Sequence, residues 1–402
     1  MKVRIEKFDY EGRGLCHIDG KVTFVPKTLK DEVVDISLEK SEKHYNNASL
    51  KEIIEKSPER IPSFCPYSSL CGGCAFSHLS YENSLKYKKE IISDLLKQNN
   101  ISFSSLEIEP SRPVLGYRNK VSLKVQEGEF GYYEEQSHRF IPIKNCFLLS
   151  TFIESLLKDF SMFHFQNGEL VIQTDSKGDM LLNIKTQDKI SILEELTKKH
   201  SIKGILLNNR LVYGTNILEE QRGNIYYRYS FHSFFQVNAY ISEKIKEDVM
   251  TYVNPKDEVY DLYCGVGFFS LPLALKAKSV IGIEENKEAI LMALENARLN
   301  YIENVSFNVG KVENILPKVK HNVTLSLVDP PRSGLKPIVI KTLIDSNIPK
   351  ILYVSCNPLT LVRDLKEFTK YYEIQSIKLY DMFSYSKHVE CVSVLHRKSL
   401  EK

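Results

Sequence analysis

One cysteine in the C-terminal half of the chain stands where a nucleophile could act. It lies in the run Ser355-Cys356-Asn357-Pro358, directly after the strongly apolar residues 351–354. Such a run predicts a buried strand that Asn-Pro ends, so the thiol is expected at a strand end. A lone cysteine is more often an inert buried residue. At a ligand-facing edge, however, its thiolate could be exposed and nucleophilic, and His388-Val389-Glu390 adds a carboxylate that could act as a base.

A second candidate binding motif is a glycine-containing turn, Asp261-Leu262-Tyr263-Cys264-Gly265-Val266-Gly267. Glycine lets the backbone turn tightly and approach a ligand at a helix N-terminus, so Gly265 is a candidate ligand contact. Glu284 ends the next apolar run, where a carboxylate can accept hydrogen bonds from ribose hydroxyls. The third glycine of the dinucleotide fingerprint is missing, so a purely structural turn is the alternative. Together the turn and Glu284 favour a nucleoside-type ligand.

The polar residues gather where the predicted strands end. Asp329-Pro330-Pro331-Arg332 follows a further apolar run, although prolines there could simply end the strand. Ligands of open α/β sheets bind at the carboxyl ends of the strands. Four polar residues fall at such ends and are expected at one edge of one sheet: Asp261, Glu284, Asp329 and Cys356.

A cysteine-rich stretch, Cys65-x5-Cys71-Gly72-Gly73-Cys74, is followed by Cys146. In a reducing compartment such spacing indicates a metal site rather than disulfides. The spacing of Cys71 and Cys74 fits zinc or an iron–sulfur cluster, and the residues alone leave both open, together with no metal at all. Other cysteines are expected to be packing residues: Cys16, Cys264 and Cys391.

These residues fall in three predicted segments. Residues 1–58 alternate in short strand-like runs with glycine turns, which is typical of a small β-barrel. Residues 59–225 hold the cysteine-rich stretch, a helix capped by Ser80 and mainly strand-like runs. Residues 226–402 alternate strands with helices, which predicts an α/β fold with a Rossmann-like, doubly wound and mostly parallel sheet that ends in an antiparallel pair. The strands predicted there are 258–263, 279–283, 305–309, 323–328, 350–354, 374–379 and 389–395, and the helices include 287–299 and 359–368.

The motifs occur together in the order found in one enzyme family. Phe234-Phe235-Gln236-Val237-Asn238 and residues 261–267, 329–332, 355–358 and 388–390 resemble the motifs of RNA 5-methyluridine methyltransferases, and the resemblance covers nearly the whole chain. It implies S-adenosylmethionine as cofactor, with cofactor or base contacts from four residues: Gln236, Tyr263, Glu284 and Asp329. It also implies that Cys356 adds to carbon 6 of uracil and that Glu390 removes the carbon 5 proton.

The resemblance extends to the first two segments. Residues 1–58 resemble a TRAM domain, a small RNA-binding barrel. Members with this cysteine spacing carry a 4Fe–4S cluster, which implies four ligands: Cys65, Cys71, Cys74 and Cys146. Resemblance to the branch of the family that has both a TRAM domain and this cysteine spacing implies 23S rRNA as the substrate, with tRNA as the alternative. Three places depart from the family pattern: Phe268, Lys311 and Ser384-Tyr385-Ser386.

Bulk composition leaves the partner open. The 54 Lys and Arg residues against 51 Asp and Glu give a formal charge of +3, which is too small to indicate nucleic-acid binding by itself. Lys86, Lys88 and Lys89 could form a local basic surface, but such a run is usually a solvated helix face. The sequence shows no secretory signal and no run near the ~20 apolar residues of a membrane helix. We therefore expect a cytoplasmic protein with no membrane partner. A monomer is the default expectation, because the sequence does not indicate the oligomeric state.

Two other functions fit parts of the sequence. A cytosine-5 RNA methyltransferase also uses a cysteine nucleophile and the same cofactor, but its motifs usually place a Pro-Cys pair after the fourth strand, where this chain has Asp329-Pro330-Pro331-Arg332. A non-catalytic RNA-binding or assembly factor could use the barrel and the cysteines, but it has no need of both Cys356 and Glu390. The sequence therefore favours the uridine enzyme.

Overall fold

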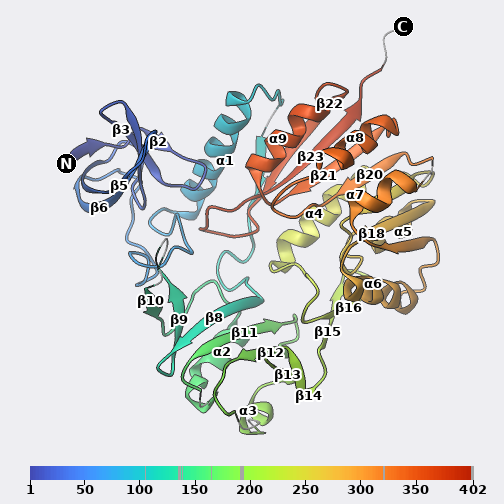
Figure 1. The fold of residues 1–402 in the computed structure, drawn as a ribbon, viewed down its shortest axis with the longest axis horizontal. Helices are drawn as coiled ribbons and strands as arrows, with labels where there is room; N and C mark the ends of the chain where they lie inside the picture. Colours follow the sequence, from blue (N-terminus) through green and yellow to red (C-terminus); the bar gives the residue numbers. More distant parts are fainter. Residues whose placement is uncertain are drawn as a thin grey trace.

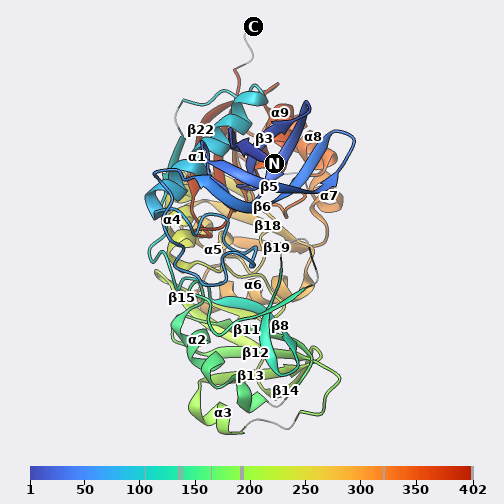
Figure 2. The same cartoon turned by 90° about the vertical axis from the view of Figure 1, so that its left-hand side faces the viewer.

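The computed structural model describes residues 1–104, 106–134, 137, 139–163, 165–190, 194–319 and 322–399. Figure 1 shows an N-terminal β-domain and a C-terminal sheet on either side of a long helix, with a central sheet below them. Seen from the side, in Figure 2, the central sheet forms one end of an elongated molecule. Among the described residues, no helix has the length and apolar character needed to cross a bilayer.

The N-terminal β-domain has the strand order β1-β5-β6-β4-β3-β2 and a small core of its own. Ile5, Val25 and Val34 are fully buried in this core, beside Cys16. The strands are β1 (Lys2–Arg4), β2 (Lys7–Phe8), β3 (Gly14–Ile18), β4 (Lys21–Val25), β5 (Val33–Ser41) and β6 (Tyr45–Glu55). The short strand-like runs that the sequence predicts here are confirmed.

The central sheet has the strand order β10-β9-β8-β11-β12-β13-β14, and α2 packs against β11. Its elements are β8 (Lys120–Gln126), β9 (Glu129–Tyr133), β10 (Phe140–Pro142), α2 (Thr151–Lys158), η1 (Phe160–Phe163), β11 (Gly168–Thr174), β12 (Met180–Lys185), α3 (Glu194–Lys199), β13 (Ile202–Leu207) and β14 (Arg210–Gly214). The hairpin of β15 (Ile217–Arg222) and β16 (Ile225–Ser230) then leads to the C-terminal sheet.

The C-terminal sheet has the order β19-β18-β17-β20-β21-β23-β22-β7. Its strands are β17 (Glu258–Leu262), β18 (Ser279–Glu284), β19 (Val305–Val309), β20 (Leu325–Val328), β21 (Lys350–Ser355), β22 (Tyr372–Tyr380), β23 (Glu390–Arg397) and β7 (Leu106–Glu109). Strands β17 to β21 are parallel, and β23 is antiparallel to both β21 and β22. The predicted mostly parallel sheet with an antiparallel pair is confirmed.

Helices cover both faces of this sheet, as in a doubly wound fold. One face packs against α4 (Ala239–Thr251), α5 (Ser270–Lys276) and α6 (Lys287–Leu299), and the other against α7 (Val312–Ile315), η2 (Leu316–Lys318), α8 (Pro337–Asp345) and α9 (Pro358–Phe368). Each face has an apolar core, which explains why the strands are apolar almost throughout rather than alternating.

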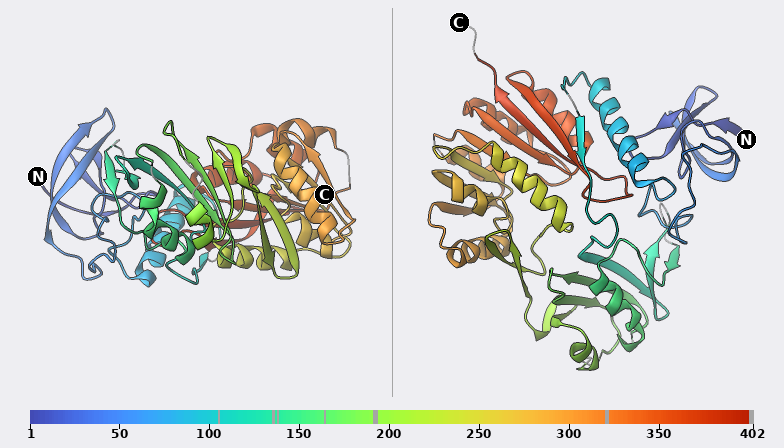
Figure 3. Two further views of the ribbon diagram at one scale, coloured as in Figure 1. Left: turned by 90° about the horizontal axis from the view of Figure 1, so that it is seen from below. Right: turned by 180° about the vertical axis from the view of Figure 1, so that it is seen from behind.

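Helix α1 (Tyr81–Gln98) joins the N-terminal β-domain to the C-terminal sheet (Figures 1 and 3). Ser80 caps it as predicted, because its side chain accepts a hydrogen bond from the Asn83 amide at 3.2 Å. The apolar side of α1 packs against α9, and β7 extends the sheet parallel to β22. Part of the segment 59–225 therefore belongs spatially to the C-terminal sheet, and the domain boundaries at 58 and 225 stay predictions.

Lys88 of α1 is buried, with 2% of its surface exposed, although the sequence favours a solvated helix face there. Its ammonium donates to Asp381 Oδ1 at 2.5 Å and to the carbonyls of Phe383 (2.9 Å) and His388 (3.0 Å). Asp381 is fully buried, and its other oxygen accepts from Tyr81 at 2.7 Å. Lys88 thus fixes residues 381–389, the loop that leads to Glu390 and is called here the 381–389 loop.

We expect Lys88→Met to destabilise the protein by about 3–5 kcal/mol, because it leaves the Asp381 carboxylate buried without its cation. The midpoint of urea denaturation measures the loss. Lys88→Met combined with Asp381→Asn removes both charges and should recover much of it. Equal stability of Lys88→Met and wild type would show that the pair does not hold the loop.

Candidate active site

All of the predicted catalytic and cofactor residues line one cleft of about 560 Å³ at the carboxyl edge of the parallel strands. They are Gln236, Tyr263, Gly265, Glu284, Asp329, Cys356 and Glu390. The strand order β18-β17-β20-β21-β23 spreads them along this edge, with Glu284 at one end and Glu390 at the other. From β18 to β21 the cleft spans three strand spacings, about 15 Å, which is enough for a nucleoside and an attached chain.

The β18 end of the cleft is shaped for a nucleoside. Gly265 has a φ of +54°, and the space that a Cβ would take there is open. Its amide donates to Glu284 Oε2 at 3.2 Å, while Asn286 donates to Oε1 at 2.8 Å. The carboxylate is thus held in place with lone pairs left for ribose hydroxyls. Tyr263 has a φ of +66°, a strained conformation for a bulky residue of the kind that is concentrated at functional sites.

The pKa is raised for two carboxyl groups here: Asp329 in the cleft and Asp261 beneath it. Burial raises the pKa of Asp261 to about 7, although a hydrogen bond from Ser270 opposes this shift. Burial, and then the charge of Asp261, raise the pKa of Asp329 to about 7. Asp261 Oδ1 has no hydrogen-bond partner among the described residues. A cation in the cleft would stabilise the ionised forms of both groups. The two carboxyl groups therefore fit a ligand with positive charge, such as a sulfonium.

Cys356 follows β21 directly and precedes α9, whose first turn is capped by Asn357 through a 3.1 Å hydrogen bond from the Leu359 amide. The cap ends the strand at this point and turns the chain, so that the thiol faces the cleft. Burial is the largest cause that raises the pKa of Cys356, to about 11, and the charges of Glu390 and Asp329 add to it. The resting side chain is therefore a thiol at neutral pH.

Glu390 begins β23 and is 9% exposed. Ser355 pairs with Cys391 across β21 and β23, so Cys356 and Glu390 are the next residues along the two strands. Burial, and then the charge of Asp329, hold the pKa of Glu390 well above its ordinary value, while Arg332 opposes this shift. A thiol and a carboxyl group therefore face the same end of the cleft.

Sequence reasoning missed two residues of this site. Arg332 lines the cleft and lowers the pKa of both Cys356 and Glu390, in opposition to their burial. It belongs to the motif Asp329-Pro330-Pro331-Arg332, but only the fold places its cation near Cys356 and Glu390. Phe234 also lines the cleft and is 66% exposed, which is unusual for a phenylalanine and was not visible in its motif.

The positions that depart from the family pattern have separate surroundings. Phe268 is buried against Tyr227 and Phe235, away from solvent. Lys311 lines the cleft near α7. Ser384-Tyr385-Ser386 lies in the 381–389 loop, where Tyr385 has a φ of +60° and its carbonyl accepts from the Phe76 amide at 2.9 Å. This last departure connects the loop before Glu390 to the cysteine-rich stretch.

The four predicted metal ligands lie close enough to affect one another. Burial raises the pKa of Cys74 to about 12, and Cys146, Cys71 and Cys65 each contribute to the shift. Within the described part of the chain, however, no group of three or more His, Cys, Asp or Glu side chains is arranged to hold a metal ion. The metal site is therefore not shown by the structure. Three other cysteines are buried packing residues as expected: Cys16, Cys264 and Cys391.

Comparison with known proteins supplies the family context for this cleft. Residues 176–398 match the model of the family described as tRNA (Uracil-5-)-methyltransferase. An uncharacterized RNA methyltransferase of Caldanaerobacter subterraneus subsp. tengcongensis is 32% identical over 99% of this chain and 98% of its own. One of Aquifex aeolicus is 31% identical over 99% of each chain. The solved tRNA (uracil-54, C5)-methyltransferase of Pyrococcus abyssi, in complex with S-adenosyl-L-homocysteine, has the same fold, with a TM-score of 0.81, 24% identity and coverage of 98% of this chain and 100% of that chain.

We expect alkylation of Cys356 by iodoacetamide to become about tenfold faster per pH unit between pH 7 and 10, because only the thiolate reacts and the pKa is about 11. Arg332→Gln removes a cation that lowers this pKa, so it should slow the alkylation about threefold at each pH. Peptide mass spectrometry separates Cys356 from the other cysteines. A rate that does not change with pH would contradict the raised pKa.

Proposed function

The chain belongs to the tRNA (uracil-5-)-methyltransferase family, and we propose that it transfers a methyl group from S-adenosylmethionine to carbon 5 of a uridine in RNA, with Cys356 as covalent nucleophile. The observation that carries the proposal is the single cleft that has Glu284 and Gly265 at one end and Cys356 and Glu390 at the other. A nucleoside cofactor and a reacting base can therefore lie end to end along one sheet edge.

The chemistry requires a nucleophile because carbon 5 of uracil is a poor nucleophile itself. The Cys356 thiolate adds to carbon 6 and leaves an enolate whose carbon 5 is electron-rich. S-adenosylmethionine, which Gly265 and Glu284 would hold, would supply carbon 5 with an electrophilic methyl group from its sulfonium and would leave as S-adenosylhomocysteine. Glu390, as a carboxylate, then removes the carbon 5 proton, and the bond between carbon 6 and Cys356 breaks to release the thiolate. Arg332 favours the ionised forms of both residues that these steps need.

The target uridine must leave its stack to reach Cys356, because the thiol lies inside the cleft. For the RNA class we propose 23S rRNA, as the N-terminal β-domain and the cysteine spacing suggest. Transfer RNA is the alternative, because the solved structure of the same fold is named a tRNA (uracil-54, C5)-methyltransferase.

We expect wild-type protein with S-adenosylmethionine to form 5-methyluridine in unmodified 23S rRNA, and Cys356→Ala to form none while it still binds the cofactor. Glu390→Gln should instead accumulate a covalent protein–RNA complex, because the methylated adduct keeps its carbon 5 proton and cannot eliminate. Nucleoside mass spectrometry and denaturing gels measure the two outcomes. Methylation of tRNA in place of rRNA would correct the substrate class, and normal methylation by Cys356→Ala would exclude covalent catalysis.

For the cysteine-rich stretch we propose a structural 4Fe–4S cluster on Cys65, Cys71, Cys74 and Cys146. The backbone supports thiolates here. Gly73 donates its amide to Cys71 Sγ at 3.4 Å, two residues after the cysteine. Burial raises the pKa of Cys65 and Cys146, but hydrogen bonds from the amides of Tyr67 and Leu148, again two residues later, lower it. Repeated amide donors of this kind stabilise the negative charge of metal-bound sulfur.

We expect anaerobically purified protein to contain about four iron atoms and four acid-labile sulfides per chain, the content of one such cluster. Cys74→Ser should lose most of the iron, whereas Cys16→Ala, a buried cysteine of the N-terminal β-domain, should keep it. Elemental analysis and sulfide release measure both. Zinc without sulfide would replace the cluster with a zinc site, and no metal in fresh protein would leave the four cysteines as packing residues.

A further inference from the structure

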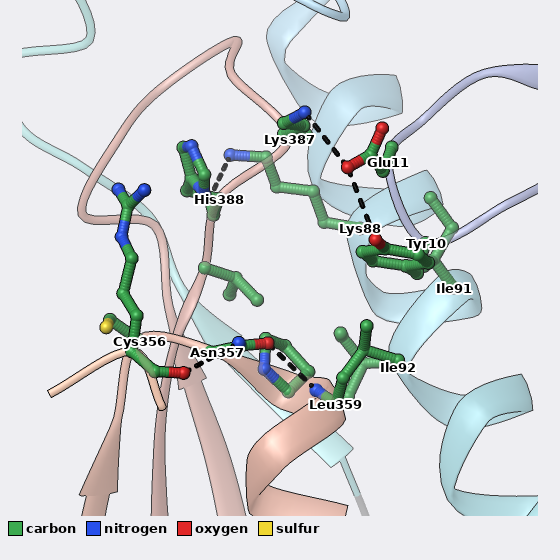
Figure 4. A pocket seen from close by; sticks show the side chains of 13 residues that line it. Tyr10, Glu11, Lys88, Ile91, Ile92, Cys356, Asn357, Leu359, Lys387 and His388 are labelled. Atoms are coloured by element: carbon green, nitrogen blue, oxygen red, sulfur yellow. Dashed lines mark hydrogen bonds and ion pairs between the residues drawn. The ribbon is translucent and has the colours of Figure 1, made fainter. Parts of the chain in front are cut away.

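A second cavity, of about 420 Å³, opens on the other side of Cys356. It shares Arg332 and Cys356 with the cleft of the candidate active site, so the two cavities meet at the Cys356 thiol. Figure 4 shows Cys356 at one side of this cavity and Tyr10 with Glu11 at the opposite side, in front of α1. Its volume lies within the usual range of small-ligand pockets. The mechanism described above makes no use of this space.

Contacts between three parts of the chain fix the walls of the second cavity. Glu11 of the N-terminal β-domain forms a 3.3 Å ion pair with Lys387 of the 381–389 loop. Phe8, just before Tyr10, packs its ring against Tyr87 of α1, with ring centroids 4.7 Å apart. Tyr10 is therefore held across the cavity from Cys356 by contacts on both sides of it.

The lining combines the surfaces that recognise a nucleotide. Tyr10 is 45% exposed and offers a ring on which a base can stack. Ile92 and Leu359 provide apolar walls around it. Arg332, at the opening toward the cleft, presents a guanidinium whose donors match phosphate oxygens. Lys387 and the Glu11 carboxylate also line this cavity. An aromatic platform beside cationic side chains is the pattern of single-stranded nucleic-acid sites.

We propose that this cavity binds the base of the nucleotide adjacent to the target uridine, stacked on Tyr10. The assignment rests on the proposed function. A polynucleotide whose uridine lies against Cys356 must continue to a covalently attached neighbour, and the second cavity is the space that meets the cleft at that residue. The N-terminal β-domain then acts as part of the substrate site and contributes to the choice of sequence next to the uridine.

Steady-state methylation of an RNA oligonucleotide that the wild-type enzyme accepts tests the proposal. Tyr10→Ala should raise the KM for RNA about tenfold or more, which is the effect of losing one base–aromatic stack, with a much smaller change in kcat. Tyr10→Phe keeps the ring and should restore most of the affinity. Tyr371→Ala, which removes a 48% exposed tyrosine just after the C-terminal end of α9, is the matched control and should leave the KM unchanged. An unchanged KM in Tyr10→Ala overturns the proposal.

An abasic nucleotide placed on the 5′ or the 3′ side of the target uridine identifies the partner of Tyr10. One of the two abasic RNAs should raise the wild-type KM about as much as Tyr10→Ala does. Tyr10→Ala assayed with that same abasic RNA should show no higher KM than either change gives alone. Effects that multiply in the combination overturn the contact. Absence of any 5-methyluridine with wild-type protein rejects the proposed function itself, which is a different result from normal methylation without a Tyr10 effect.

Discussion

The buried ammonium of Lys88 is the constraint on which the geometry of the site depends. A lysine side chain that loses its water needs a full set of acceptors, and Asp381 together with the carbonyls of Phe383 and His388 supplies them. These acceptors lie along the 381–389 loop, so the pair determines how the chain enters β23. Because Glu390 is the first residue of that strand, the position of its carboxyl group follows from a contact made by α1, a helix far away in the sequence.

Crowded carboxyl groups set the electrostatics of the cleft. Burial raises the pKa of Asp261, Asp329 and Glu390, so the ionised forms of these groups cost more than they would in water. A sulfonium brings a positive charge into the same space and lowers the cost of ionising them. Arg332 acts in the same direction from the side of the second cavity. Under the proposed function, binding of the cofactor would therefore favour the carboxylate form of Glu390 through charge.

The sequence was most informative where local pattern alone determines position. Alternation of strands and helices predicts a parallel sheet, and parallel strands bring Glu284, Asp329 and Cys356 to one edge whatever the rest of the fold does. Lys88 and Tyr10 could not be recognised in this way. Lys88 lies in a helix and Tyr10 in the turn between β2 and β3, and the local pattern gives no more than that. The surroundings of each arise from packing between distant segments, as with Lys88 and Asp381, which are 293 residues apart. The four cysteines predicted as metal ligands stand between these cases, because their spacing predicts a metal site but does not identify the metal, and the described part of the structure does not show the site.

The cysteine-rich stretch also acts on the site through packing. Tyr385 of the 381–389 loop lies between the rings of Phe64 and Tyr81, with centroids 4.8 Å and 5.7 Å away, and its carbonyl binds the Phe76 amide. Its φ of +60° is unfavourable for a tyrosine, so these contacts must hold it. Anything that orders residues 64–76 therefore also orders the 381–389 loop, which leads to Glu390. A cluster on these cysteines would act on catalysis through that loop without any change of its own oxidation state, which is the reason to regard it as structural.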